Sequence, residues 1–154
     1  MKFAADSSLL MRLYVRGGDT ETVERFLTED AKVVSVSELA RIEVLNILLR
    51  YPERADQFLA DLQLGTQLKL EPLKWDDAFR QAESLARRFS PSLLPGGHDL
   101  VLVAAAVTMG ATWFLSFDRN SRQRALASVA GLRVWPPLDK NEKGLARHVS
   151  RTAS

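Results

Sequence analysis

Residues 100–118 read LVLVAAAVTMGATWFLSFD, and this stretch decides the fold. Residues 100–109 are almost all apolar, which predicts a helix buried nearly all round that ends at Gly110. Residues 112–117 are rich in aromatic and apolar side chains and predict a strand, with Asp118 directly after it. A buried helix that leads into a buried strand is typical of an α/β fold with helices on both faces of a mostly parallel sheet.

The same alternation of helices and strands extends outward from this stretch to most of the chain. Further strands are expected at 2–5, 32–36, 68–70 and 132–135, and helices at 7–16, 20–29, 37–50, 53–62, 75–88 and 119–130. Ser37 is the expected N-cap of its helix. Residues 90–97 are expected to form a loop because they contain two prolines and two glycines.

The apolar faces of two of these helices predict where the core lies. In the 37–50 helix, Ile42, Ile47 and Leu49 belong to a broad apolar side that is expected to pack on the sheet. In the 75–88 helix, Phe79 belongs to the expected buried set. We expect one domain over residues 1–138, followed by a polar, partly basic tail at 139–154 that is mobile or ordered by a partner.

Composition restricts the chemistry of any site. The chain has 154 residues, no cysteine, two histidines and a formal net charge of +2. A disulfide framework and a thiolate zinc site are therefore excluded, and oxygen ligands favour Mg²⁺ or Mn²⁺. The first residues lack the apolar core of a signal peptide, and no stretch approaches a membrane span, so we expect a cytoplasmic protein without membrane contact.

Four carboxylates are the candidate catalytic and metal-binding residues. Asp6 and Asp118 each follow a predicted strand, at the carboxyl edge where α/β folds place their ligands. Asp99 stands at the start of the buried helix, and Glu43 lies among apolar neighbours one to two turns into its own helix. Mutually repelling carboxylates in one crevice are stable mainly when a cation neutralises them, and such a cation could promote phosphodiester hydrolysis.

Each position also has a purely structural interpretation. Asp6, Asp99 and Asp118 could be helix N-caps, and Glu43 could pair with Arg41 or with a distant basic residue. His98 could donate a proton or contact a nucleic acid, or it could simply lie on the surface. Arginines at 87, 88, 119, 122 and 124 could hold phosphates or form solvated helix faces.

Taken together, the local contexts of the four carboxylates resemble the PIN-domain ribonuclease family, particularly the VapC-type toxins of toxin–antitoxin systems. The matching pieces are Ala5-Asp6-Ser7-Ser8-Leu9-Leu10, Ser37-Glu38-Leu39-Ala40-Arg41-Ile42-Glu43, His98-Asp99-Leu100 and Ser116-Phe117-Asp118. The resemblance covers about residues 2–135. The Gly-Gly loop and histidine before Asp99, and the chain after residue 138, depart from the family pattern.

The resemblance implies a PIN-like three-layer α/β/α sandwich and an endoribonuclease that uses Mg²⁺ or Mn²⁺. Asp6, Glu43, Asp99 and Asp118 would form its acidic cluster, with Ser7 and Ser116 as supporting hydroxyls. It also implies an RNA substrate, a homodimer and a cognate antitoxin, as in a type II toxin–antitoxin pair.

Other functions remain open at this point. One alternative is a PIN-like RNA-processing nuclease without an antitoxin, and another is a PIN-like fold kept as a binding or scaffolding module. A third is a phosphoaspartate-type protein, either a receiver or a phosphatase. The phosphatase pattern has an aspartate two residues after its nucleophile, where this chain has Ser8, and the acidic pair and late lysine of a receiver are not found.

Overall fold

A computed structural model describes residues 1–30 and 33–153. Five strands form one parallel sheet in the order β3-β2-β1-β4-β5. The strands are β1 (Phe3–Ala5), β2 (Val34–Val36), β3 (Leu68–Leu70), β4 (Trp113–Leu115) and β5 (Arg133–Trp135). The predicted α/β class and parallel sheet are therefore confirmed. Lys32, which the sequence placed in the second strand, lies outside the described residues.

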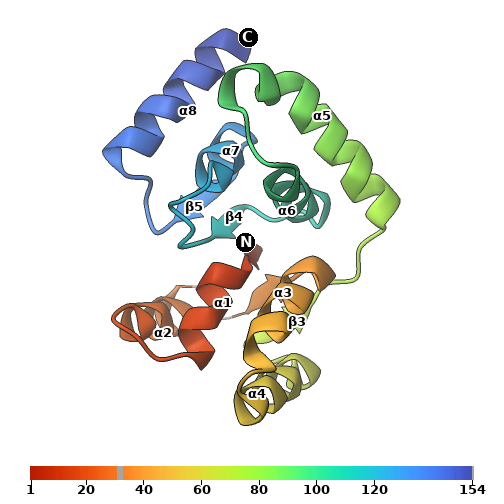
Figure 1. The fold of residues 1–154 in the computed structure, drawn as a ribbon, viewed down its shortest axis with the longest axis vertical. Helices are drawn as coiled ribbons and strands as arrows, with labels where there is room; N and C mark the ends of the chain where they lie inside the picture. Colours follow the sequence, from red (N-terminus) through yellow and green to blue (C-terminus); the bar gives the residue numbers. More distant parts are fainter. Residues whose placement is uncertain (31–32, 154) are drawn as a thin grey trace.

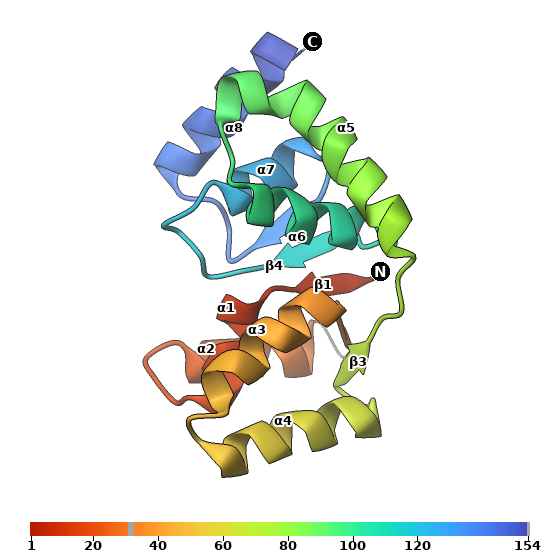
Figure 2. The ribbon, with the colours of Figure 1, turned by 45° about the vertical axis from the view of Figure 1, so that its right-hand side comes forward.

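Helices cover both faces of the sheet. They are α1 (Ser7–Tyr14), α2 (Thr20–Glu29), α3 (Glu38–Leu48), α4 (Pro52–Leu64), α5 (Trp75–Leu93), α6 (Gly97–Thr108), α7 (Gln123–Val129) and α8 (Lys140–Ala153). The helices α1 to α4 lie on one side of the strands and α5 to α8 on the other (Figures 1 and 2). The order is that of a three-layer sandwich.

The alternation of side chains along the strands divides the core in two. Phe3 and Ala5 of β1 pack with residues of α1 to α4, whereas Ala4 between them packs with residues of α5 to α8. In β4, Leu115 joins the first cluster and Phe114 the second. Both faces of the sheet are thus dry, and its edge at the strand ends is where polar groups can gather.

Several sequence predictions about element ends are wrong. The helix α5 continues through Pro91 to Leu93, so the first part of the expected 90–97 loop is helical, and α6 begins earlier than expected, at Gly97. The helix α7 begins at Gln123 instead of 119. The N-cap role of Ser37 is confirmed, since its hydroxyl accepts a hydrogen bond from the Ala40 N–H at 3.2 Å.

The expected mobile tail is also wrong, because residues 140–153 form α8, which packs against α5 and α7. Ala146 and Val149 are its buried residues. Asp139 and Glu142 form a capping box at its start, in which each side chain accepts a hydrogen bond from the other residue's N–H at 2.8 Å and 3.0 Å. A domain boundary near residue 138 remains a prediction.

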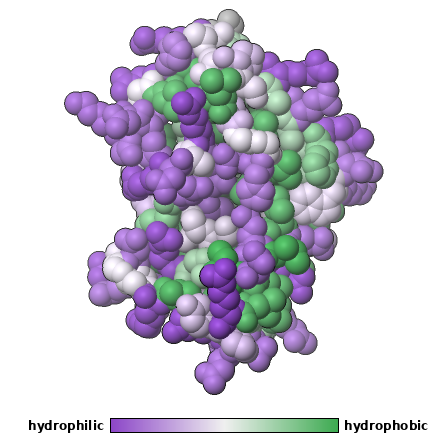
Figure 3. Space-filling view, viewed as in Figure 1, coloured by the Kyte–Doolittle hydropathy of each residue, from purple (hydrophilic) through white to green (hydrophobic). Residues whose placement is uncertain are grey.

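Part of the predicted core lies on the surface. Ile42 is 56% exposed and Phe79 is 58% exposed, and Ile47 and Leu49 are exposed as well. A groove of about 300 Å³ between α3, α5 and α6 includes the side chains of Ile42, Phe79 and Val101. Apolar side chains gather over α3 and toward α5 on this face (Figure 3).

Among the described helices, none is long and apolar enough to cross a bilayer.

Candidate metal and catalytic site

Asp6 is buried at the end of β1, with only 2% of its surface exposed. Its Oδ1 accepts hydrogen bonds from the Leu9 N–H at 3.1 Å and from the Ser8 hydroxyl at 2.6 Å. Its Oδ2 accepts hydrogen bonds from the Ser116 hydroxyl and from the Gln123 amide, both at 2.6 Å. The cap interpretation is therefore confirmed for Asp6, which is the N-cap of α1, but a cap explains only one of its four donors.

Burial raises the pKa of Asp6, because desolvation penalises the charged carboxylate. The four hydrogen bonds favour the charged form and oppose this effect. A protein that keeps a carboxyl group in such a position, surrounded by donors, is organised to hold a negative charge there.

Glu43 lies on α3 with one oxygen bound and the other free. Its Oε2 accepts a hydrogen bond from the Ser7 hydroxyl at 3.4 Å and lies 2.9 Å from Nε2 of His98. Its Oε1 is buried and has no hydrogen-bond partner among the described residues. In the described part of the chain Glu43 does not pair with Arg41 but with a distant basic residue, His98, so the second of its structural alternatives is confirmed. A buried carboxylate oxygen without a donor is costly unless a cation or water satisfies it.

Asp99 lies in the first turn of α6, whose N-cap is Gly96. Its pKa is raised, chiefly by burial and also by repulsion from Asp118 and Glu43. The backbone of Gly96 and the charge of His98 oppose the increase. The cap interpretation is wrong for Asp99. The repulsion places Glu43 and Asp118 each within electrostatic reach of Asp99.

Asp118 follows β4 in a turn. Its Oδ1 accepts a hydrogen bond from the Asn120 N–H at 3.1 Å, and its Oδ2 accepts one from the Ser121 hydroxyl at 2.9 Å. The N-cap of α7 is Arg122, so Asp118 is not a helix cap either. The turn orders the chain just after the strand and keeps the carboxylate at the sheet edge.

Two predicted serines join the carboxylates. Ser7 donates to Glu43, as described above, and the Ser116 hydroxyl both donates to Asp6 and accepts the Asp118 N–H at 3.1 Å. Ser116 therefore connects the acidic residues that follow β1 and β4, which are neighbouring strands. The sequence missed Gln123, a buried amide that also contacts the Ser116 hydroxyl at 3.1 Å.

The donor chemistry suits a hard divalent cation, but the carboxylates do not form a closed cage. In the described residues, no group of three or more acidic or histidine side chains is arranged to hold a metal ion. Mg²⁺ usually keeps several waters and binds protein through one or two carboxylates, so an open arrangement is compatible with it. The unpaired Oε1 of Glu43 is free to bind a cation, and the repulsion of Asp99 by Asp118 and Glu43 would be relieved by one.

The arginines after Asp118 have structural partners. Arg124 is fully buried, and its guanidinium donates to the carbonyls of Ser116, Pro136 and Pro137 and to Glu142. Arg122 donates to a backbone carbonyl of α5, and Arg119 lies 3.5 Å from Asp139. A phosphate-binding role is therefore wrong for Arg124.

Comparison with known proteins agrees with this description. A model of the PIN domain family matches residues 4–127. VapC20 of Mycobacterium tuberculosis, described as a sarcin-ricin loop cleaving toxin, is similar in fold, with a TM-score of 0.61 and 22% identity over 85% of this chain and 96% of that one. No protein with a curated description matches the sequence significantly.

Two solved complexes are similar as well. A toxin–antitoxin complex from Klebsiella pneumoniae gives a TM-score of 0.66 with 13% identity over 90% of this chain and 99% of that one. VapBC2 of Rickettsia felis, bound to a DNA fragment from its promoter, gives a TM-score of 0.62 with 10% identity over 90% of this chain and 100% of that one. At these identities the likeness concerns the fold.

Proposed function

This chain belongs to the PIN domain family, and we propose that it is a Mg²⁺- or Mn²⁺-dependent endoribonuclease, the toxin of a type II toxin–antitoxin pair. The observation that carries the proposal is the buried Oε1 of Glu43, which has no hydrogen-bond partner among the described residues, together with the repulsion of Asp99 by Glu43 and by Asp118. A divalent cation held there would polarise the phosphodiester and ready a water for attack. Asp6, Glu43, Asp99 and Asp118 are the proposed catalytic and metal-binding residues.

The chain's own side chains prepare the site for that chemistry. Ser7 and His98 hold one oxygen of Glu43, which leaves the other, Oε1, free to bind a cation. Ser116 and Gln123 fix Asp6, and the turn after β4 fixes Asp118. Such preorganisation matters because phosphodiester hydrolysis depends on charge stabilisation at fixed positions.

Three further parts of the proposal concern partners and place. The similar structure from Klebsiella pneumoniae is described as a toxin–antitoxin complex, which supports a small antitoxin as the partner. The exposed apolar groove between α3, α5 and α6 supports a homodimer, since such patches usually mark interfaces. We propose that the protein acts in the cytoplasm on RNA.

The phosphoaspartate alternative conflicts with the surroundings of Asp6. A phosphoryl acceptor must present one oxygen to its substrate, whereas both oxygens of Asp6 are hydrogen-bonded and the residue is buried. The nuclease proposal needs no covalent bond to Asp6, because a cation would take the place of one of its side-chain donors.

Cleavage of a labelled RNA by the purified, partner-free protein tests the proposal. We expect cleavage with Mg²⁺ or Mn²⁺, none in EDTA, and loss of activity in Glu43→Gln and Asp118→Asn. Glu53→Gln, which removes an exposed carboxylate from α4, is the matched control and should keep activity. Unchanged cleavage in both site variants would refute the assignment of the site.

A further inference from the structure

The charges of α8 are sorted onto two sides of the helix. The acidic residues at its start, Asp139 and Glu142, pair with Arg119 of the loop after β4, and Glu142 also pairs with Arg124 of α7. Glu142 is the only acidic residue in the sequence of the helix itself. The rest of α8 therefore carries basic side chains and no acidic residue of its own.

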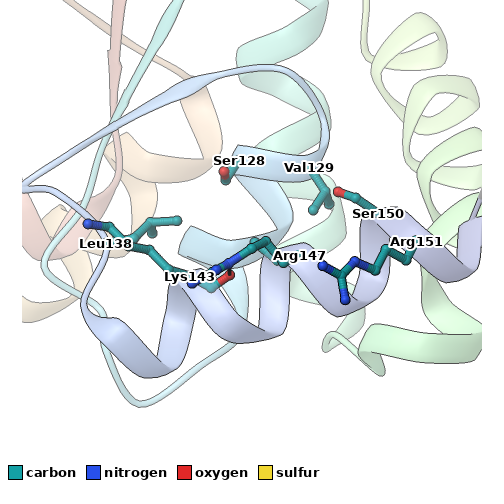
Figure 4. Close-up of a pocket in the computed structure, with 8 residues that line it drawn as sticks. Ser128, Val129, Leu138, Lys143, Arg147, Ser150 and Arg151 are labelled. Atoms are coloured by element: carbon teal, nitrogen blue, oxygen red, sulfur yellow. Dashed lines mark hydrogen bonds between the residues drawn. The ribbon is translucent and has the colours of Figure 1, made fainter.

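These cations line a groove of about 480 Å³ between α7 and α8, which we call the α7–α8 groove. Its lining is basic, hydroxyl-bearing and apolar, and contains no carboxylate: Ser128, Val129, Leu138, Lys143, Ala146, Arg147, Ser150 and Arg151. In Figure 4 the three basic side chains follow one another along α8, with Ser128 and Val129 of α7 opposite. The groove thus offers a row of positive charge with hydroxyl donors beside it.

Two of the cations are available to a ligand. Lys143 and Arg147 are exposed, and within residues 1–30 and 33–153 neither has an acidic side chain within ion-pair distance. Arg147 makes a long hydrogen bond of 3.4 Å to the carbonyl of Lys143, four residues earlier. Unpaired cations at this spacing repel one another, so the row gains by binding an anion with repeated charges.

The row starts beside the proposed catalytic site. Arg119 directly follows Asp118 in the sequence and pairs with Asp139, so α8 begins next to the loop that carries this carboxylate. Lys143 comes one turn later. From Lys143 to Arg147 the helix rises about 6 Å, and a nucleic-acid strand has one phosphate per roughly 3.4 Å of its axis. The two cations are therefore separated by about two phosphate steps.

We propose that the α7–α8 groove binds the backbone phosphates of RNA that extends from the cleavage site. The inference rests on the proposed function for its choice of ligand. Evenly spaced cations with serine hydroxyls favour a phosphate backbone, because such groups make most protein contacts to it and read no base. The groove would then position the RNA backbone relative to the catalytic site, whatever the base sequence of the RNA.

Binding measured without divalent cations tests this separately from cleavage. Fluorescence anisotropy of a labelled 20-nucleotide single-stranded RNA in EDTA would compare the wild type with Lys143→Ala/Arg147→Ala. Each lost phosphate contact reduces the magnitude of the slope of log K against log salt concentration by about 0.7. At 0.1 M salt this change corresponds to about fivefold weaker binding. We therefore expect about 25-fold weaker binding and a slope smaller by about 1.4.

The matched control is Arg25→Ala/Arg54→Ala, which removes the same charge from α2 and α4, at the opposite end of the molecule from α8 (Figure 1). Wild-type affinity in the α8 variant, an equal loss in the control, or no RNA binding by the wild type would each overturn the proposal. So would equally tight binding of a poly-glutamate peptide of similar charge, because the groove would then suit an acidic protein segment. A protein that binds as expected but cleaves nothing would refute the nuclease proposal alone.

Discussion

The ion pair between Arg124 and Glu142 gives the sharpest test of how α8 is joined to the catalytic edge. The Arg124 side chain is fully buried and that of Glu142 is 13% exposed, with Nε of Arg124 2.8 Å from the carboxylate. Glu142→Ala leaves the buried guanidinium without its counter-charge. Removing one partner of a buried pair costs about 3–5 kcal/mol. We expect the lower end, about 3 kcal/mol, because Arg124 keeps its backbone carbonyl acceptors.

Thermal unfolding followed by circular dichroism measures this effect. For a domain of this size, 1 kcal/mol corresponds to roughly 2–4 °C, so the Tm of Glu142→Ala should fall by about 6–12 °C. Asp139→Ala is the control, since it removes the other half of the capping box but leaves the Arg124 pair intact. Its Tm should fall much less. If the two variants lose the same Tm, the carbonyls alone compensate Arg124, and the argument from buried charge is wrong.

Three further predictions concern the site and the apolar groove. Burial and neighbouring carboxylates raise the folded-state pKa of Asp99 above its usual 3.8, so ionisation of Asp99 lowers the stability of the fold as pH rises through that pKa. In EDTA, Asp99→Asn should therefore raise Tm at neutral pH and lose this advantage in acid. An unchanged Tm at neutral pH would contradict the repulsion among these carboxylates. Gln123→Leu removes a hydrogen bond to the buried Asp6, which should cost roughly 2 kcal/mol and lower Tm by about 4–8 °C. An unchanged Tm would contradict a stabilising role of Gln123 at Asp6. Phe79→Glu should convert a dimer to a monomer in light scattering, while Leu64→Glu on α4, at a residue that is 70% exposed against 58% for Phe79, should not.

The sequence predicted the sheet and most helices because apolar residues recur at a different spacing in helices than in strands. Each β-branched or aromatic run forms a strand. Asp6 and Asp118 follow neighbouring parallel strands, so both lie at the same carboxyl edge, as predicted. The same patterns could not distinguish a core face from an exposed apolar face. Ile42 and Phe79 have the spacing of buried residues but line a surface groove, since spacing records that a face is apolar and not what covers it.

Two helix errors have different physical causes. Pro91 and the glycines after it suggested a loop, yet Phe89 and Leu93 are 1% and 0% exposed, and their burial stabilises the helix past the missing N–H of the proline. In α8, by contrast, the sequence did contain a signal. The Asp139-x-x-Glu142 pair is a capping box, which predicts a helix start even where apolar residues are few.

Gln123 could not have been predicted from its place in the sequence. It lies 117 residues from Asp6 and contacts it only because α7 packs beneath the end of β1. A glutamine in a short helix usually faces solvent, and no spacing rule marks one that is 1% exposed. Supporting residues of this kind depend on the tertiary structure.

The four carboxylates of the site are unequal, and their surroundings suggest different contributions. Four protein groups donate to the oxygens of Asp6, whereas Oε1 of Glu43 has no partner among the described residues. A cation would therefore gain most at Glu43, whose free oxygen it would satisfy, and at Asp99, which Glu43 and Asp118 repel, and least at Asp6, where it would compete with four donors. It follows that Asp6→Asn should reduce folding stability as well as activity, because its amide would face two side-chain donors. Glu43→Gln should reduce activity with little loss of stability.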